Sequence, residues 1–255
     1  DFRFRNTDKW ILRGGPSMKV PDMLEYSLWF HTNSSKKLFF LLEGNSDQGL
    51  EGNYSLYRIS SELSYRPWPN LVLSLEPSYE RTVDELQYIG CFKNSLADKK
   101  YLLGRIDNRN LNITFRADFA LTPELTIQYY GSPFISLGKY SNFKEVVKPL
   151  DTDYNKRFVS VIPEVNGLIY TFDDNNDGVK DYFISNPDFN FQQFRSNLVL
   201  RWEYRAGSTL YLVWSQDKTA WEQAGPFDFN KGINNMLGIY PKNIFMIKLN
   251  YWFSN

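Results

Sequence analysis

The chain has 255 residues, a length that fits one large all-β domain as readily as two small domains. Acidic and basic residues balance at 29 each, so the composition indicates no polyanionic partner such as nucleic acid. No apolar run approaches the ~20 residues of a membrane-spanning helix, which excludes a helical membrane protein. A transmembrane barrel is not excluded, because each of its strands needs only ~9–11 residues. The single cysteine, Cys91, allows no internal disulfide.

Apolar and polar residues alternate with a period of two along the whole chain, which is typical of β-strands with two different faces. We expect about twelve strands, within roughly 10 to 14, and one short helix near 230–237. In chain order the predicted strands are 1–13, 25–32, 36–44, 53–66, 71–77, 84–92, 99–107, 110–121, 125–132, 194–205, 208–216 and 243–253.

The alternation alone does not decide between two all-β architectures. A soluble β-sandwich or lipocalin-like barrel buries its apolar residues inside, whereas a membrane barrel turns them toward lipid. Very short turns ("RPWPNL", "ALTPEL", "YRAGSTL") alternate with longer polar connections, as in membrane barrels with short periplasmic turns and long extracellular loops. The last strand is aromatic, and Tyr and Trp stand at strand ends, where an interfacial girdle would lie: Tyr65, Trp68, Tyr204, Trp214, Tyr251 and Trp252. The sequence therefore predicts an antiparallel transmembrane β-barrel.

This prediction treats residues 1–255 as a single outer-membrane domain. If the last strand runs toward the periplasm, the three tight turns fall on the periplasmic side, as they should in such a barrel. Two long extracellular connections are then expected, an excursion at about 132–188 and a second loop at about 217–242. The chain opens at Asp1 without an initiator Met, which suggests a processed or truncated piece of a longer protein.

The most specific chemical motif is "TFDDNNDGVKDYF" in the long excursion. Asp173, Asn175, Asp177 and Asp181 carry side-chain oxygens around the sharp turn that Gly178 permits, and Ca²⁺ prefers such an all-oxygen cage. The motif is no EF-hand, because Ile184 stands where the bidentate Glu would be. We expect a structural Ca²⁺ site that pins an extracellular loop; the alternative is a solvated turn rich in Asp and Asn.

Catalysis is not expected. His31 is the only histidine, so any Ser-His-Asp arrangement would have to use it. Carboxylates such as Glu62, Glu76, Asp118 and Glu203 stand in strands that also carry arginines, and these charges suggest a compensated network inside the barrel. A Ca²⁺-dependent, phospholipase-like hydrolase at the membrane surface remains the alternative.

The stretches "NPDFNF", "RWEYRAGST" and "YSNFKE" resemble the C-terminal barrel of an uncharacterised outer-membrane family of Gram-negative bacteria. In that family a carbohydrate-binding family-9-like domain usually precedes the barrel. The resemblance implies an outer-membrane location, contact with outer-membrane lipid, and a link to glycan handling; it supplies no catalytic residue. We therefore expect a narrow or plugged pore, or a membrane platform for protein partners or a preceding periplasmic domain within a transport or glycan-handling assembly.

Overall fold

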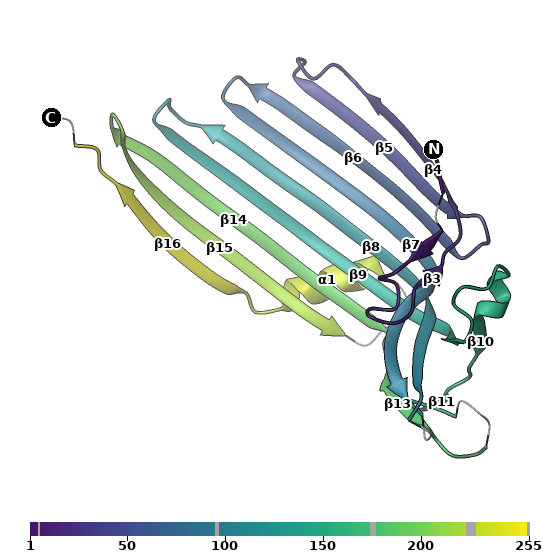
Figure 1. The fold of residues 1–255 in the computed structure, drawn as a ribbon. Helices are drawn as coiled ribbons and strands as arrows, with labels where there is room; N and C mark the ends of the chain where they lie inside the picture. The colour runs from purple at the N-terminus through teal and green to yellow at the C-terminus, as the bar shows by residue number, and fades with distance from the viewer. Residues whose placement is uncertain (5, 95–96, 174–176, 223–227, 254–255) are drawn as a thin grey trace.

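The structure, a computed structural model, describes the chain except residues 5, 95–96, 174–176, 223–227 and 254–255. Its main feature is one broad antiparallel sheet, formed by the long diagonal strands of Figure 1. The predicted all-β, antiparallel class is therefore confirmed. The long strands follow one another across the sheet in chain order: β4 (Met23–His31), β5 (Leu38–Gly49), β6 (Tyr54–Trp68), β7 (Leu71–Lys93), β8 (Lys99–Ala120), β9 (Leu125–Val146), β14 (Phe189–Arg205), β15 (Ser208–Glu222) and β16 (Lys242–Asn250).

The sheet is open at both margins. At one margin the short strand β1 (Phe2–Arg3) pairs with the start of β4. At the other, β16 pairs with β15 and, within the described part of the chain, with no second strand. Strand β10 (Phe158–Ser160) pairs with the end of β9 and brings the sheet to 11 strands. The described residues form 16 strands in all, more than the expected 10 to 14, and two of the 11 strands of this sheet, β1 and β10, are only two and three residues long. The closed barrel that we expected is not seen in the described part of the chain.

Two pairs of predicted strands are each one long strand. The ranges 71–77 and 84–92 belong to β7, which has 23 residues, and 99–107 and 110–121 belong to β8, which has 22. Pro77 does not break β7, because it is registered against Ile113 of β8 while no residue of β6 is registered against it. The range 1–13 was predicted as one strand and is not; its described residues form β1 and β2 (Thr7–Asp8) and no other strand.

Both long connections are shorter than predicted. The excursion expected at 132–188 begins only after Val146, because residues 132–138 continue β9 and pair with β14 in spite of Gly131 and Pro133. The loop expected at 217–242 is shortened in the same way, since β15 continues to Glu222. The predicted short helix is confirmed as α1 (Phe229–Gly238), which Asp228 caps by accepting a hydrogen bond from the backbone N–H of Lys231.

The strand connections define two ends of the sheet. We call the end with the connections 32–37, 69–70, 121–124 and 206–207 the turn side, and the opposite end the loop side. The three tight turns share one side, as predicted, because consecutive antiparallel strands must alternate in direction. The alternation of short and long connections is not strict, since the link 50–53 on the loop side is shorter than 32–37 on the turn side.

Small elements cover the loop-side ends of β7, β8 and β9. Adjacent Leu102 and Leu103 of β8 point to opposite faces, and each is fully buried. Leu103 packs with Leu12 and Met18 of the N-terminal segment, and Leu102 packs with Phe172. The elements involved are β2, β3 (Met18–Lys19), β11 (Glu164–Asn166), β12 (Ile169–Phe172), β13 (Tyr182–Ser185) and the 3-10 helix η1 (Tyr154–Arg157). Among the described residues no helix is long and apolar enough to cross a membrane.

Candidate functional site

The candidate site is one face of the main sheet, which the strand register defines. Directly paired residues of neighbouring strands point to the same face. One row of direct partners crosses the sheet from β5 to β16: Leu38, Tyr65, Leu73, Ala117, Tyr129, Leu198, Trp214 and Phe245. We call the residues of this face the "apolar belt". It consists of every second residue, counted from the first, within 26–30, 38–42, 57–65, 71–79, 111–119, 125–129, 198–202, 210–214 and 245–249, and all of these are apolar or aromatic except Ser61.

The apolar belt is open to its surroundings, although it would be the core of a soluble sandwich. Large side chains on it are strongly exposed, with 78% of Leu28, 75% of Phe245 and 74% of Ile247 accessible. Monomeric soluble proteins rarely expose apolar patches larger than a few hundred Å². A surface of this kind therefore indicates contact with an apolar phase or with another chain.

The height of the belt follows from the length of strand that it covers and from the tilt of the strands. On β7 and β8 it covers residues 71–79 and 111–119, and eight residue steps at about 3.4 Å give about 27 Å along the strand. The tilt of the strands follows from how far their turn-side ends shift along the row of direct partners. On β5 the row passes through Leu38, the first residue of the strand. Six strands further on, it passes through Trp214, which lies six residues beyond the first residue of β15. Each strand is therefore shifted by one residue relative to its neighbour. A shift of about 3.4 Å along the strand for a spacing of about 4.8 Å between strands corresponds to a strand tilt of about 35°. At that tilt the belt is about 22 Å high on β6, β7 and β8, where it spans nine residues, and about 11 Å high on the strands where it spans five.

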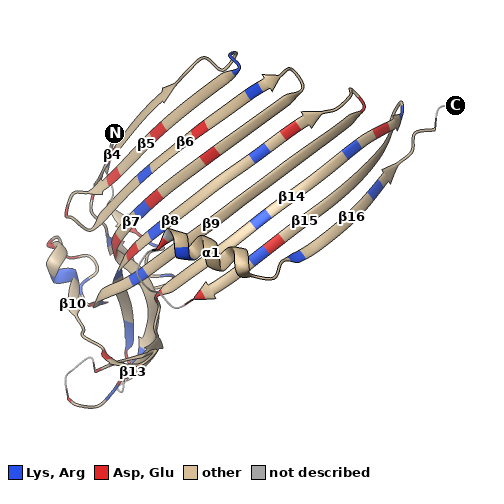
Figure 2. Ribbon diagram, turned by 180° about the vertical axis from the view of Figure 1, so that it is seen from behind, with Lys and Arg blue, Asp and Glu red and all other residues tan. Residues whose placement is uncertain are grey.

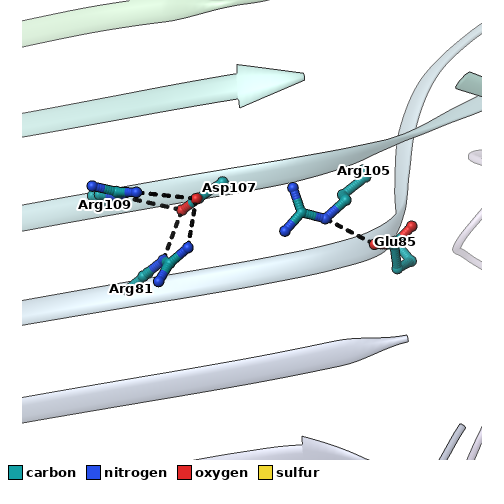
Figure 3. Close-up of polar contacts among 5 residues, drawn as sticks. All are labelled: Arg81, Glu85, Arg105, Asp107 and Arg109. Carbon is teal, nitrogen blue, oxygen red and sulfur yellow. Dashed lines mark hydrogen bonds and ion pairs between the residues drawn. The ribbon is translucent and has the colours of Figure 1, made fainter. Parts of the chain in front are cut away.

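Charged residues end the belt on the loop side. Beyond residues 79 and 111 the same face carries Arg81, Asp107 and Arg109 (Figure 3). The Asp107 carboxylate accepts hydrogen bonds from Arg81 Nη2 at 2.8 Å and Nε at 3.0 Å, and from Arg109 Nη2 at 3.3 Å. These bonds, first of all those from Arg81, lower the pKa of Asp107 from 3.8 to about 2. Next to them Arg105 pairs with Glu85 at 2.9 Å.

Helix α1 lies on the same face as the belt, again on the loop side (Figure 2). Gly232 of α1 lies so close to Ile135 of β9 that an added Cβ would come within 2.7 Å of its side chain. Lys218 of β15 donates a hydrogen bond to the Leu237 carbonyl, and Asn235 donates one to Glu222. The connection between β15 and β16 is thus folded back over the sheet just beyond the belt.

The opposite face of the sheet is polar, and its side chains are largely paired with one another. Asn110 donates to Asn108 Oδ1 and to Glu80, and accepts a hydrogen bond from the Ser136 hydroxyl at 2.6 Å. Arg58 forms an ion pair with Glu80 on the same face. Such cross-strand pairs satisfy polar groups without bulk water.

The predicted charge compensation is confirmed in part. Arg116 pairs with Glu76 at 3.8 Å and Arg201 with Glu203 at 2.9 Å. Asp118, in contrast, accepts a hydrogen bond from Gln128. Of the aromatic residues predicted at strand ends, all but the half-buried Tyr204 are exposed. Trp214 lies inside β15 and not at its end.

The N-terminal segment, residues 6–22, follows β1 and crosses the loop-side part of the polar face (Figure 1). A cavity of about 470 Å³ lies between this segment and the sheet, lined among others by Asp8 and Arg13 of the segment and by Glu25, Asp47 and Asp84 of the sheet. The sequence analysis missed this arrangement because residues 1–13 alternate like a strand. The run "RGGPS" at 13–17, a turn signal, could have revealed it.

One buried arginine outside the predicted sites holds this segment. Arg157 of η1 is 1% exposed. Its guanidinium donates hydrogen bonds to the Lys19 carbonyl at 2.9 Å, the Asp151 carbonyl at 2.8 Å and the Thr152 carbonyl at 3.2 Å. Burial of a charge is tolerated only with such partners, so Arg157 ties the N-terminal segment to the excursion after β9.

The predicted calcium motif is described only in part, because Asn175 lies outside the described residues. Asp173 Oδ2 accepts a hydrogen bond from the Gly178 N–H at 2.8 Å, and Asp177 Oδ1 accepts one from the Val179 N–H at 2.8 Å. Gly178 has a φ of +85°, as the predicted sharp turn requires. Among the described residues no group of three or more His, Cys, Asp or Glu could hold a metal ion.

His31 lies at the turn-side end of β4 with an exposed ring. Its Nδ1 is 2.9 Å from the Thr32 carbonyl oxygen, and its ring stacks on Trp29 at 5.4 Å. The structure thus brings His31 next to a backbone carbonyl and an indole, and it brings neither a serine nor a carboxylate to it by a hydrogen bond in the described residues.

No curated protein matches the chain in sequence, and no solved structure matches it. A family model described as "Domain of unknown function (DUF5916)" matches residues 3–254. This match covers almost the whole chain, and the chain therefore belongs to the DUF5916 family. That this family is uncharacterised agrees with the resemblance described above.

Proposed function

We propose that the chain is part of the wall of an outer-membrane β-barrel in a Gram-negative bacterium, with the apolar belt against lipid and the polar face toward the interior. The observation that carries the proposal is the exposed belt that ends at charged residues on the same face. On β6, β7 and β8 its height of about 22 Å is close to the ≈ 25 Å apolar band of outer-membrane barrels. The tilt of about 35° falls at the lower limit of the 35–45° that closed barrels need.

Within the membrane the protein acts as a narrow or plugged pore, or as a platform within a transport or glycan-handling assembly. The N-terminal segment supports the plugged form, since it lies across the polar face and Arg157 fixes it there. A carbohydrate-binding domain and protein partners belong to the platform form of this proposal. Single-channel conductance in planar bilayers separates the two forms: a plugged barrel conducts only after the N-terminal segment is released.

Ca²⁺ has a structural role in this proposal, in the loop that contains Asp173, Asp177 and Asp181. The turn geometry at Gly178 supports it, although backbone N–H groups already occupy part of the carboxylate oxygens. A Ca²⁺-dependent hydrolase is the second candidate function, and a soluble β-sandwich or lipocalin-like binding protein is the third. The surroundings of His31 do not favour the hydrolase, since its ring contacts Trp29 and its Nδ1 lies at a backbone carbonyl.

Membrane fractionation combined with heat-modifiable migration in a cold detergent gel tests the proposal. A folded outer-membrane barrel is recovered in the outer-membrane fraction and migrates faster before boiling than after it. A protein that stays monodisperse in buffer without detergent would overturn the proposal, because water would then cover the apolar belt.

A further inference from the structure

The two margins of the main sheet present free strand edges. Beyond Glu25 the outer edge of β4 has no strand partner among the described residues, and it carries the belt residues Tyr26, Leu28 and Phe30. At the far margin all nine residues of β16 are exposed. Free edges of this length are templates for pairing with another strand, and native proteins rarely leave them uncovered.

The directions of the strands restrict what can cover these edges. Eight antiparallel pairings lead from β4 to β16, so both strands run toward the turn side. Direct pairing of β16 with β4 would therefore be parallel, although every pairing in this sheet is antiparallel. A second copy inserted in the same orientation into the membrane would also bring β4 and β16 together in parallel. If further strands lie between β16 and β4, all neighbouring strands are antiparallel only when the number of these further strands is odd.

Strand β1 shows where the first additional strand lies. The Asp1 amino group donates a hydrogen bond to the Glu25 carbonyl at 2.7 Å, and the Glu25 N–H donates one to the Asp1 carbonyl at 2.8 Å. Phe2 is registered against Leu24 and Arg3 against Met23. Strand β1 thus runs antiparallel to β4. An extension of β1 in the N-terminal direction, beyond Asp1, would lie along the free edge of β4 toward the turn side.

We propose that an odd number of further strands bridges β16 and β4, and that the strand beside β4 is the continuation of β1 by residues that precede Asp1 in the natural protein. The inference rests on the proposed barrel. An odd number of further strands, added to the nine strands from β4 to β16, closes that barrel with an even number of strands. The register fixes the partners: the first, third and fifth residues before Asp1 lie opposite Tyr26, Leu28 and Phe30. These three residues then face lipid, so we expect apolar side chains there.

Disulfide trapping tests the register. Asp1 and Glu25 exchange both backbone hydrogen bonds, so the pair at Leu28 is a non-hydrogen-bonded pair with a Cα separation of about 4.5 Å, within reach of a disulfide. In the natural protein with Cys91→Ser, we combine Leu28→Cys with a Cys at the third residue before Asp1. The matched control has its Cys at the fourth residue, which points to the other face. We expect an intramolecular disulfide in the first variant and none in the control.

Three other outcomes would be decisive. Absence of the disulfide in a protein that still fractionates with the outer membrane and is heat-modifiable overturns the inference and leaves the proposed function standing. A disulfide-linked dimer of a variant with Leu28→Cys and Ile247→Cys overturns it in favour of a second copy. Loss of the membrane fraction overturns the proposed function itself.

Amide hydrogen exchange needs no substitution and covers the case in which the cysteine variants do not fold. In the natural protein the N–H groups on the outer edge of β16 are expected to exchange as slowly as those of the inner strand β8. Rapid exchange at β16 beside slow exchange at β8 would overturn the inference.

Discussion

Replacement of Leu75 by arginine is the sharpest test of which phase covers the apolar belt. Leu75 lies at the centre of the belt on β7, directly between Leu63 of β6 and Phe115 of β8. An arginine at the mid-plane of an outer-membrane barrel costs about 2–4 kcal/mol of folding free energy. On a water-exposed surface the same change stays within about 0.5 kcal/mol, and Leu75 is 40% exposed.

The measurement is the free energy of unfolding in lipid bilayers, from urea titration followed by tryptophan fluorescence. Because 1.4 kcal/mol is a factor of ten, Leu75→Arg is expected to lower the folding equilibrium constant by about 30- to 1,000-fold. Ser78→Arg is the matched control: it adds the same side chain three residues away on the polar face, directly between the uncharged Ser60 and Asn112. Equal and small effects of the two substitutions would refute the assignment of the belt to lipid.

Four further predictions concern single groups. The pKa of Asp107, which lies beyond the belt, is lowered from 3.8 to about 2, so its stabilisation is complete above pH ~4 and is lost as the pH falls through ~2; Asp107→Asn should flatten the acid unfolding profile in that window. Arg157→Met removes hydrogen bonds to three carbonyls and should destabilise the protein by about 3 kcal/mol, with faster proteolysis of residues 1–22; unchanged cleavage would contradict the anchoring role. If the loop at 173–181 binds Ca²⁺, added Ca²⁺ should raise the unfolding temperature of the natural protein but not that of Asp177→Asn. His31→Ala should leave any lipid hydrolysis by the preparation unchanged. Loss of hydrolysis in this variant would support the hydrolase instead of the pore or platform.

Local sequence features predicted the strands and their two faces well where pairing is regular. The period-two alternation predicted that the apolar residues of a strand share one face, and the register shows Leu198 of β14 and Leu212 of β15 on the same face. Strand length was predicted poorly, because Pro77, Gly131 and Pro133 are signals of a break. In the structure the pairing of long neighbouring strands outweighs these local preferences.

The candidate site was predictable in its residue types and unpredictable in its surroundings. The charges that end the belt come from two strands, so that Asp107 meets Arg81 across 26 positions of sequence. Arg157 meets the Lys19 carbonyl across 138 positions, and nothing in the local pattern indicates that this arginine is buried. Contacts of this range depend on register, which single-strand periodicity does not contain.

The sequence by itself determined that the chain is all-β and which residues of a strand share a face, because successive side chains of any extended chain point to opposite sides. Only the tertiary structure decided that the apolar face is the uncovered one, that the N-terminal segment lies on the polar face, and that, in the part of the chain that the structure describes, neither sheet margin has a further strand partner. The physical reason is that a period of two is the same for a strand in a sandwich and in a membrane wall. What lies against each face depends on which segments, distant in the chain, are brought to it.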